Sequence, residues 1–130
     1  MCPISIKLSE RIDVGRNEVV MGVTKLRIEI YVLYQHSTYS QNLHVIRVFE
    51  DQSPFRLQRK IDIKDIKQPH DIGSNDKENC LFVFRMHYSC VYKITRETDG
   101  QHKIIKLLKT DEILFPMSVS SDGQLIIFSA

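Results

Sequence analysis

Long apolar runs, an excess of charge of one sign and paired cysteines are all missing from this chain of 130 residues. No stretch reaches the about 18 consecutive apolar residues that span a membrane, and the start lacks the basic region and apolar run of a signal peptide. We therefore expect a cytoplasmic protein that does not contact a membrane. Lysine and arginine number 18 against 16 aspartates and glutamates, and the difference is spread along the chain. This balance does not favour nucleic acid as the main partner.

Cysteine is scarce, and the motifs of common enzymes are lacking. The three cysteines, Cys2, Cys80 and Cys90, form no Cys-x-x-Cys pair and have no histidine at metal-ligand spacing, so we expect half-buried free thiols in a reducing compartment. No Gly-x-Ser-x-Gly nucleophile motif and no phosphate-binding glycine loop occurs. We predict no cofactor, no metal site and no catalytic residue.

The chain does contain an internal repeat of roughly 50 residues. Each copy has a basic and apolar strand, an acidic turn, a short apolar step and a strongly apolar strand. The short step carries an apolar–small pair, at Met21-Gly22, Ile72-Gly73 and Val119-Ser120. This period is typical of a β-propeller blade, which is a sheet of four antiparallel strands.

The repeat predicts where the strands lie. Alternating apolar residues in Val45–Phe49 indicate a strand with both faces at least partly covered. We expect an innermost strand a as a short step at each anchor pair, where glycine suits crowding near a central channel. Strand b is expected at Arg27–Tyr34 and Leu81–Arg85, strand c at Leu43–Phe49 and Val91–Thr95, strand d at Phe55–Ile63 and Lys103–Leu108, and one more a–b pair at Met117–Ser121 and Leu125–Phe128.

Several of these segments resemble the six-bladed β-propellers built from NHL-type repeats. The resemblance rests on the sequence PHDI at Pro69–Ile72, on the series CLFVF, CVYKI and KIIKLL, and on the closing SVSSDGQLIIFS. Propellers of the WD type are less similar, because the chain has no tryptophan to end a blade with Trp-Asp. The resemblance implies an all-β fold of consecutive four-stranded antiparallel blades. The chain is then a single partial domain over residues 1–130, with blade parts at 4–63, 69–110 and 116–130.

A complete propeller needs about four to eight blades, which exceeds this length. We therefore expect a fragment of a larger propeller protein, with self-association of several copies as the alternative way to complete a ring. An open array leaves the end blades uncovered, which favours the first alternative.

The predicted binding site lies on one rim of the propeller. His36 and His87 follow their anchor glycines at the same spacing, in the hairpin between strands b and c. In propellers this hairpin shares a face with the connection between blades, which holds His70 and Asp71. Flat aromatic and imidazole surfaces suit a protein partner, although a solvated hairpin explains the same residues. The predicted binding residues are His36, Tyr39, His70, Asp71, His87 and Tyr88.

We therefore predict a non-catalytic protein-interaction module, and two alternatives stay open. The first is a fragment of a lactonase-like propeller hydrolase, which would need acidic residues at the start of each strand a to line the central channel; Asp71 is the only one in register. NHL-type propellers also include RNA-binding members, and the basic stretch Arg56–Lys67 fits that reading less well because Asp62 and Asp65 interrupt it.

Overall fold

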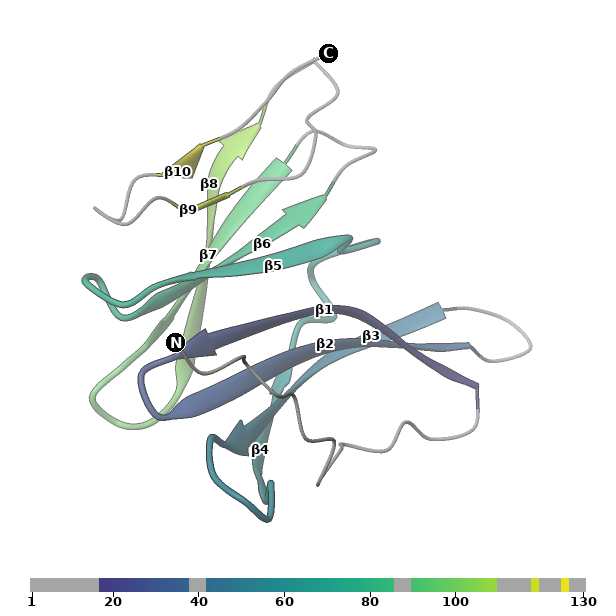
Figure 1. Cartoon of the computed structure of the whole chain (residues 1–130). Coiled ribbons are helices and arrows are strands. Elements are labelled where there is room, and N and C mark those ends of the chain that lie inside the picture. The colour runs from purple at the N-terminus through teal and green to yellow at the C-terminus, as the bar shows by residue number, and fades with distance from the viewer. Residues whose placement is uncertain (1–16, 38–41, 86–89, 110–117, 120–124, 127–130) are drawn as a thin grey trace, which may run out of the picture.

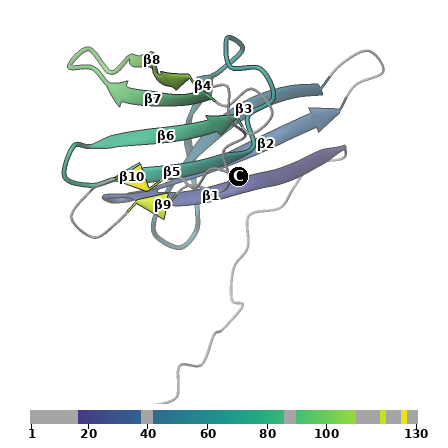
Figure 2. The ribbon, with the colours of Figure 1, turned by 90° about the horizontal axis from the view of Figure 1, so that it is seen from above.

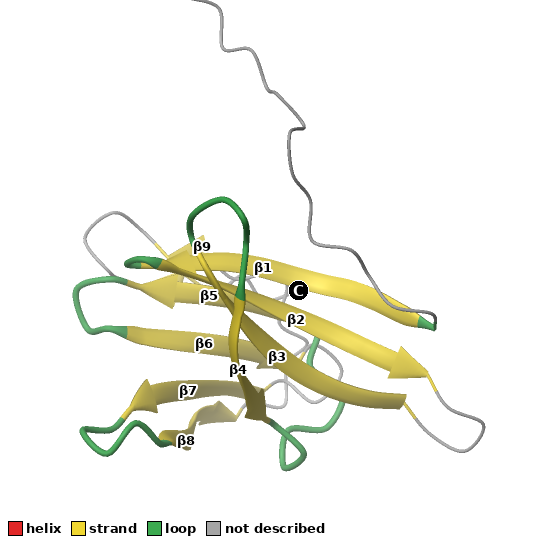
Figure 3. Cartoon of the chain, turned by 90° about the horizontal axis from the view of Figure 1, so that it is seen from below, coloured by secondary structure: helices red, strands yellow, loops and turns green. Residues whose placement is uncertain are grey.

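The computed structural model describes residues 17–37, 42–85, 90–109, 118–119 and 125–126. These residues form ten β-strands and no helix, so the described part of the chain is all-β, as predicted (Figure 1). The connections that the structure describes are turns and loops, drawn green in Figure 3. Within the described residues, no helix is long and apolar enough to cross a membrane.

The first sheet is an antiparallel meander of four strands in chain order. They are β1 (Glu18–Leu26), β2 (Glu29–Ser37), β3 (Asn42–Glu50) and β4 (Leu57–Asp62). A tight turn joins β1 to β2, and Arg27 in that turn has a positive φ of 57°. The carboxylate of Asp76 stabilises the turn from the second sheet, since its Oδ1 accepts a hydrogen bond from Arg27 N at 2.9 Å.

The second sheet repeats the same strand order. It comprises β5 (Asp71–Asn75), β6 (Cys80–Arg85), β7 (Cys90–Arg96) and β8 (His102–Lys109). The turn from β5 to β6 is held by the side chain of Asn75, whose Oδ1 accepts hydrogen bonds from Lys77 N at 3.0 Å and Glu78 N at 3.4 Å. A short antiparallel pair follows, β9 (Ser118–Val119) with β10 (Leu125–Ile126).

The two four-stranded sheets pack face to face around one apolar core. Alternation along each strand places Tyr31 and Leu33 of β2 on the face that meets Leu81 and Val83 of β6. β6 is buried at every position, because both of its faces are covered. The remaining buried members of this core are Leu26, Ile46, Val48, Ile61, Ile63, Ile66, Ile72, Cys90, Tyr92 and Ile94.

The first strands of successive sheets lie side by side. β1 contacts β5, and β5 contacts β9 (Figures 1 and 2). Thr24 and Ser74 link β1 to β5, with 2.8 Å between their hydroxyl oxygens, and Ser74 Oγ also donates to the carbonyl of Lys25 at 2.7 Å. At Gly22 the two strands approach so closely that an added Cβ would lie 3.0 Å from Cγ2 of Ile72. Side-chain hydrogen bonds and a glycine therefore join these two strands, which belong to different sheets.

Within the described residues, each predicted strand overlaps a strand of the structure, and residues 117, 120–121, 127 and 128 of the last predicted pair lie outside them. Three other expectations differ from the structure. β1 has nine residues where we expected a short step, because a bulge between Val20 and Gly22 lets it pair with β2 on both sides of the glycine. Cys80 is a free thiol, as expected, but Cys80 and Cys90 are both fully buried rather than half-buried, since both begin interior strands. His36 lies within β2 rather than in the hairpin that follows it. Cys2 lies outside the described residues.

Candidate functional site

A groove runs along the end of the first sheet where β2 ends and β3 begins. Its volume is about 1170 Å³, and the connection from β4 to β5 forms its other wall. His36 reaches it from β2, and Gln68, Pro69 and His70 reach it from the connection. The structure thus brings together His36 and His70, two of the predicted binding residues.

The connection from β4 to β5 is fixed by its apolar residues. Ile63 and Ile66 are buried, and Ile66 N donates a hydrogen bond to the carbonyl of Ile63 at 2.8 Å, which closes a turn. His70 N donates to the carbonyl of Phe84 at 2.7 Å and ties the segment to the second sheet. Lys64 and Lys67 lie between these anchors and are exposed. An ordered backbone therefore presents two lysines and a histidine to the groove.

Arg47 lies in the groove wall and is held by two partners. Its guanidinium donates to both carboxylate oxygens of Glu18, at 2.8 and 2.5 Å, and stacks 4.4 Å from the ring centroid of Tyr34. The hydrogen bond and charge of Glu18 raise the pKa of Arg47, although partial burial opposes the shift. Burial raises the pKa of the Tyr34 hydroxyl. His36 Nδ1 lies 4.0 Å from the same glutamate.

The groove keeps an excess of positive charge in addition to the Arg47–Glu18 ion pair. Lys60, Lys64 and Lys67 line it, and Asp62 is the carboxylate that opposes them. Lys64 Nζ lies 3.9 Å from Asp62 in a contact that is largely exposed on both sides. Exposed pairs of this kind contribute little energy, so the lysines stay available to a ligand.

The other predicted binding residues fall elsewhere. Asp71 does not line the groove; it is half-buried beside Gly22, and its Oδ1 accepts a hydrogen bond from Ile72 N at 2.8 Å. Tyr39, His87 and Tyr88 lie outside the described residues.

Sequence reasoning missed His44, which lines the groove from β3. Its Nε2 lies 3.3 Å from Oε1 of Gln35 across the β2–β3 pair, and burial lowers its pKa. The sequence feature that could have identified His44 is its position in the alternating pattern of β3. It stands two residues before Ile46, so the two side chains lie on the same face of the strand.

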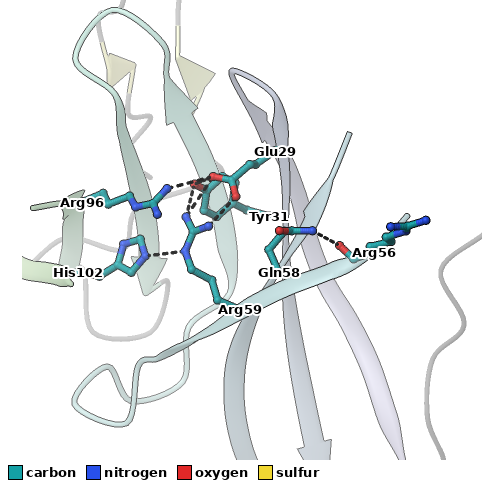
Figure 4. A network of polar contacts seen from close by, with 7 residues as sticks. All are labelled: Glu29, Tyr31, Arg56, Gln58, Arg59, Arg96 and His102. Atoms are coloured by element: carbon teal, nitrogen blue, oxygen red, sulfur yellow. Dashed lines mark hydrogen bonds and ion pairs between the residues drawn. The ribbon is translucent and has the colours of Figure 1, made fainter. Parts of the chain in front are cut away.

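A second polar cluster, also missed, lies at the opposite end of the strands (Figure 4). Arg59 of β4 donates to both oxygens of Glu29, at 2.5 and 3.1 Å, and to the Tyr31 hydroxyl at 3.0 Å. Its Nε donates to Nε2 of His102 at 3.1 Å. Arg96 of β7 approaches the same carboxylate, with Nη1 3.8 Å from Oε1 of Glu29. Two guanidinium groups from different sheets therefore meet at one carboxylate.

The charges of this cluster set its protonation. Burial by itself raises the pKa of Glu29, but hydrogen bonding and charge from Arg59, with smaller effects of Tyr31 and Arg96, lower it overall. For His102, burial first and then Arg59 and Arg96 lower the pKa. The ring is therefore neutral at pH 7, as its role as hydrogen-bond acceptor from Arg59 requires.

Among the described residues, no group of three or more histidine, cysteine, aspartate or glutamate side chains is placed to hold a metal ion. Comparisons with models of known families, with curated proteins and with solved structures found no match.

Proposed function

We propose that this chain is a segment of a β-propeller and that its groove binds an acidic stretch of a protein partner without catalysing a reaction. Two sheets with the same four-strand meander follow one another, and their first strands β1 and β5 lie side by side. This is the relation that neighbouring blades have around a propeller axis. The contact of β5 with β9 continues the series to a third unit.

The single observation that carries the binding role is the composition of the groove. It joins His36 and His70 with Lys60, Lys64 and Lys67, on an ordered backbone. Extended acidic segments suit such a surface, because complementary charge speeds encounter and the imidazole rings supply contact area. A hydrolase has less support, since Asp71 is turned toward the backbone of its own strand.

Peptide selection followed by mapping tests this function. A random peptide library is selected on the immobilised chain, and selected peptides are titrated into labelled protein while amide shifts are recorded. Acidic peptides are expected, with the largest shifts around His36, His44 and His70. The variant Lys64→Glu/Lys67→Glu should weaken their binding by about tenfold or more, because it replaces two attractive charges by repulsive ones. The matched control Lys77→Glu/Lys103→Glu makes the same charge change at exposed positions outside the groove and should leave affinity unchanged.

Three results would overturn the proposal. The first is that peptides map away from the groove, and the second is that both double variants weaken binding equally. The third is that single-stranded RNA binds the groove more tightly than any selected peptide at the same salt concentration, which would establish the RNA-binding alternative instead.

A further inference from the structure

The polar cluster around Glu29 forms the wall of a second cavity, of about 430 Å³. The first sheet contributes Arg27, Glu29 and Arg59, and the second contributes Asn79, Arg96 and His102. It lies at the end of the strands away from the groove, because Leu26, the last residue of β1, lines the cavity while Glu18, its first, lines the groove. A volume of this size is in the usual range for small-molecule sites.

Cationic groups outnumber anionic ones in this cavity. Arg27, Arg59 and Arg96 line it against the one carboxylate of Glu29, and the neutral His102 adds no charge. Among the residues that the structure describes, no carboxylate forms an ion pair with the Arg27 guanidinium, whose Nη2 donates to the carbonyl oxygen of Asp76 at 3.4 Å. The residues that line the cavity therefore carry more positive than negative charge, and a further carboxylate, that of Asp76, lies outside the lining and accepts a hydrogen bond from Arg27 N.

The cluster is also pre-organised. Glu29, Tyr31 and His102 together fix the guanidinium of Arg59, whose side chain is only 20% exposed. Arg96 is held less firmly: its side chain is 47% exposed, and 3.8 Å to Glu29 is too long for a hydrogen bond. One arginine is thus locked in the wall, while Arg96 keeps donors that a ligand can take up.

We propose that this cavity binds a small molecule bearing a carboxylate or phosphate group, with Arg96 and Arg27 as its main contacts. Guanidinium groups bind both kinds of oxyanion through paired hydrogen bonds. Glu29 acts as the internal counter-ion that keeps Arg59 in place, and the ligand supplies the second anion. Since the residues come from both sheets, the bound ligand joins them and stabilises their packing.

Titration with defined anions tests this site. Succinate and inorganic phosphate are added separately to the labelled chain at constant ionic strength, with sodium chloride as the reference salt. Saturable shifts are expected at the amides of Arg27, Asn79 and Arg96, and a rise in melting temperature with the same concentration dependence. Comparison of the two anions shows whether the carboxylate or the phosphate is the better ligand.

Two substitutions distinguish binding at this cavity from a nonspecific effect of anions on the charges of the protein. Arg96→Gln should weaken anion binding by about tenfold or more, because it removes a charged donor pair. Arg56→Gln is the matched control: Arg56 is exposed, leads into the same strand as Arg59, and does not line the cavity, so the affinity should stay the same. Lys64→Glu/Lys67→Glu should also leave it unchanged, which makes this result independent of the proposed groove.

The proposal is wrong if sodium chloride produces the same shifts as succinate and phosphate. It is equally wrong if neither anion saturates, or if Arg96→Gln and Arg56→Gln reduce binding to the same extent.

Discussion

Replacing Gly22 by alanine is expected to weaken the packing of the first sheet on the second. The added Cβ would lie 3.0 Å from Ile72 Cγ2, 3.1 Å from Asp71 Oδ1 and 3.3 Å from Ile72 N. Carbon atoms prefer about 3.5–4.0 Å, so either the Ile72 side chain or the two strands must shift by a few tenths of an ångström. Overpacking of this kind costs about 1–3 kcal/mol, and alanine recovers about 0.5–1 kcal/mol of strand propensity. The net loss is about 0–2.5 kcal/mol.

Urea unfolding followed by far-ultraviolet circular dichroism measures this loss, which suits a chain without tryptophan. With an unfolding entropy of about 2.1 cal/mol/K per residue, the melting temperature should fall by at most about 9 °C. His36→Ala serves as the comparison, because this side chain is 43% exposed and its removal should change stability by no more than about 0.5 kcal/mol.

A double-mutant cycle identifies the cause. Ile72→Ala removes the Cγ2 atom that the new methyl group meets, and alone it should cost about 2–5 kcal/mol, since Ile72 is 5% exposed. In that background Gly22→Ala should cost less than in the original chain, because only the contacts of the new methyl group with Asp71 Oδ1 and Ile72 N remain. Additive costs, or a larger loss from His36→Ala than from Gly22→Ala, would refute the close approach of β1 and β5.

Three further predictions concern the charged pairs. Glu29→Gln should destabilise the fold by about 1.5–3 kcal/mol at pH 7. The folded-state pKa of Glu29 is below its unfolded value of 4.5. Its contribution to stability is therefore present above pH 4.5 and is lost as the pH falls through the folded-state pKa. The free energy of unfolding, measured from pH 7 to pH 3, should depend less on pH in the variant than in the original chain. The pKa of His102, read by NMR titration, should lie below 6.5 and rise in Arg96→Gln, which removes one of the charges that lower it; an unchanged value would contradict the network. Arg47→Lys should cost about 1–2 kcal/mol, because lysine cannot hold both carboxylate oxygens while stacking on the tyrosine ring. Lys93→Arg is the control, because Lys93 pairs with Glu78, whose side chain is 54% exposed, and it should change stability by less than about 0.5 kcal/mol. Equal losses in Arg47→Lys and Lys93→Arg would show that the stacked geometry of Arg47 is unimportant.

The strands were predictable because their cause is local. Alternating apolar residues in Val45–Phe49, and a continuous apolar run at Leu81–Phe84, indicate strands whatever the rest of the chain does. The length of β1 was not predictable in this way, since Gly22 suggests a break in the strand. Pairing with β2 around a bulge overrides that local preference.

The site residues, too, were predictable only in part. His36 and His70 were found because a propeller-like repeat places their segments on one rim, and the structure brings both to the groove. Asp71 was placed on that rim by its position next to His70, but alternation along a strand turns neighbouring side chains in opposite directions, and its carboxylate binds its own backbone.

By itself, the sequence determined the all-β class, the order of the strands and the repeat that relates the two sheets, because these follow from patterns within a few residues of each other. Only the tertiary structure decided that Glu29, Arg59, Arg96 and His102 form one cluster, and that Gly22 faces Ile72. These contacts join strands that are far apart in the chain, and all of them except the Glu29–Arg59 pair connect the two sheets. Their geometry is set by how the two sheets pack, which no local pattern encodes.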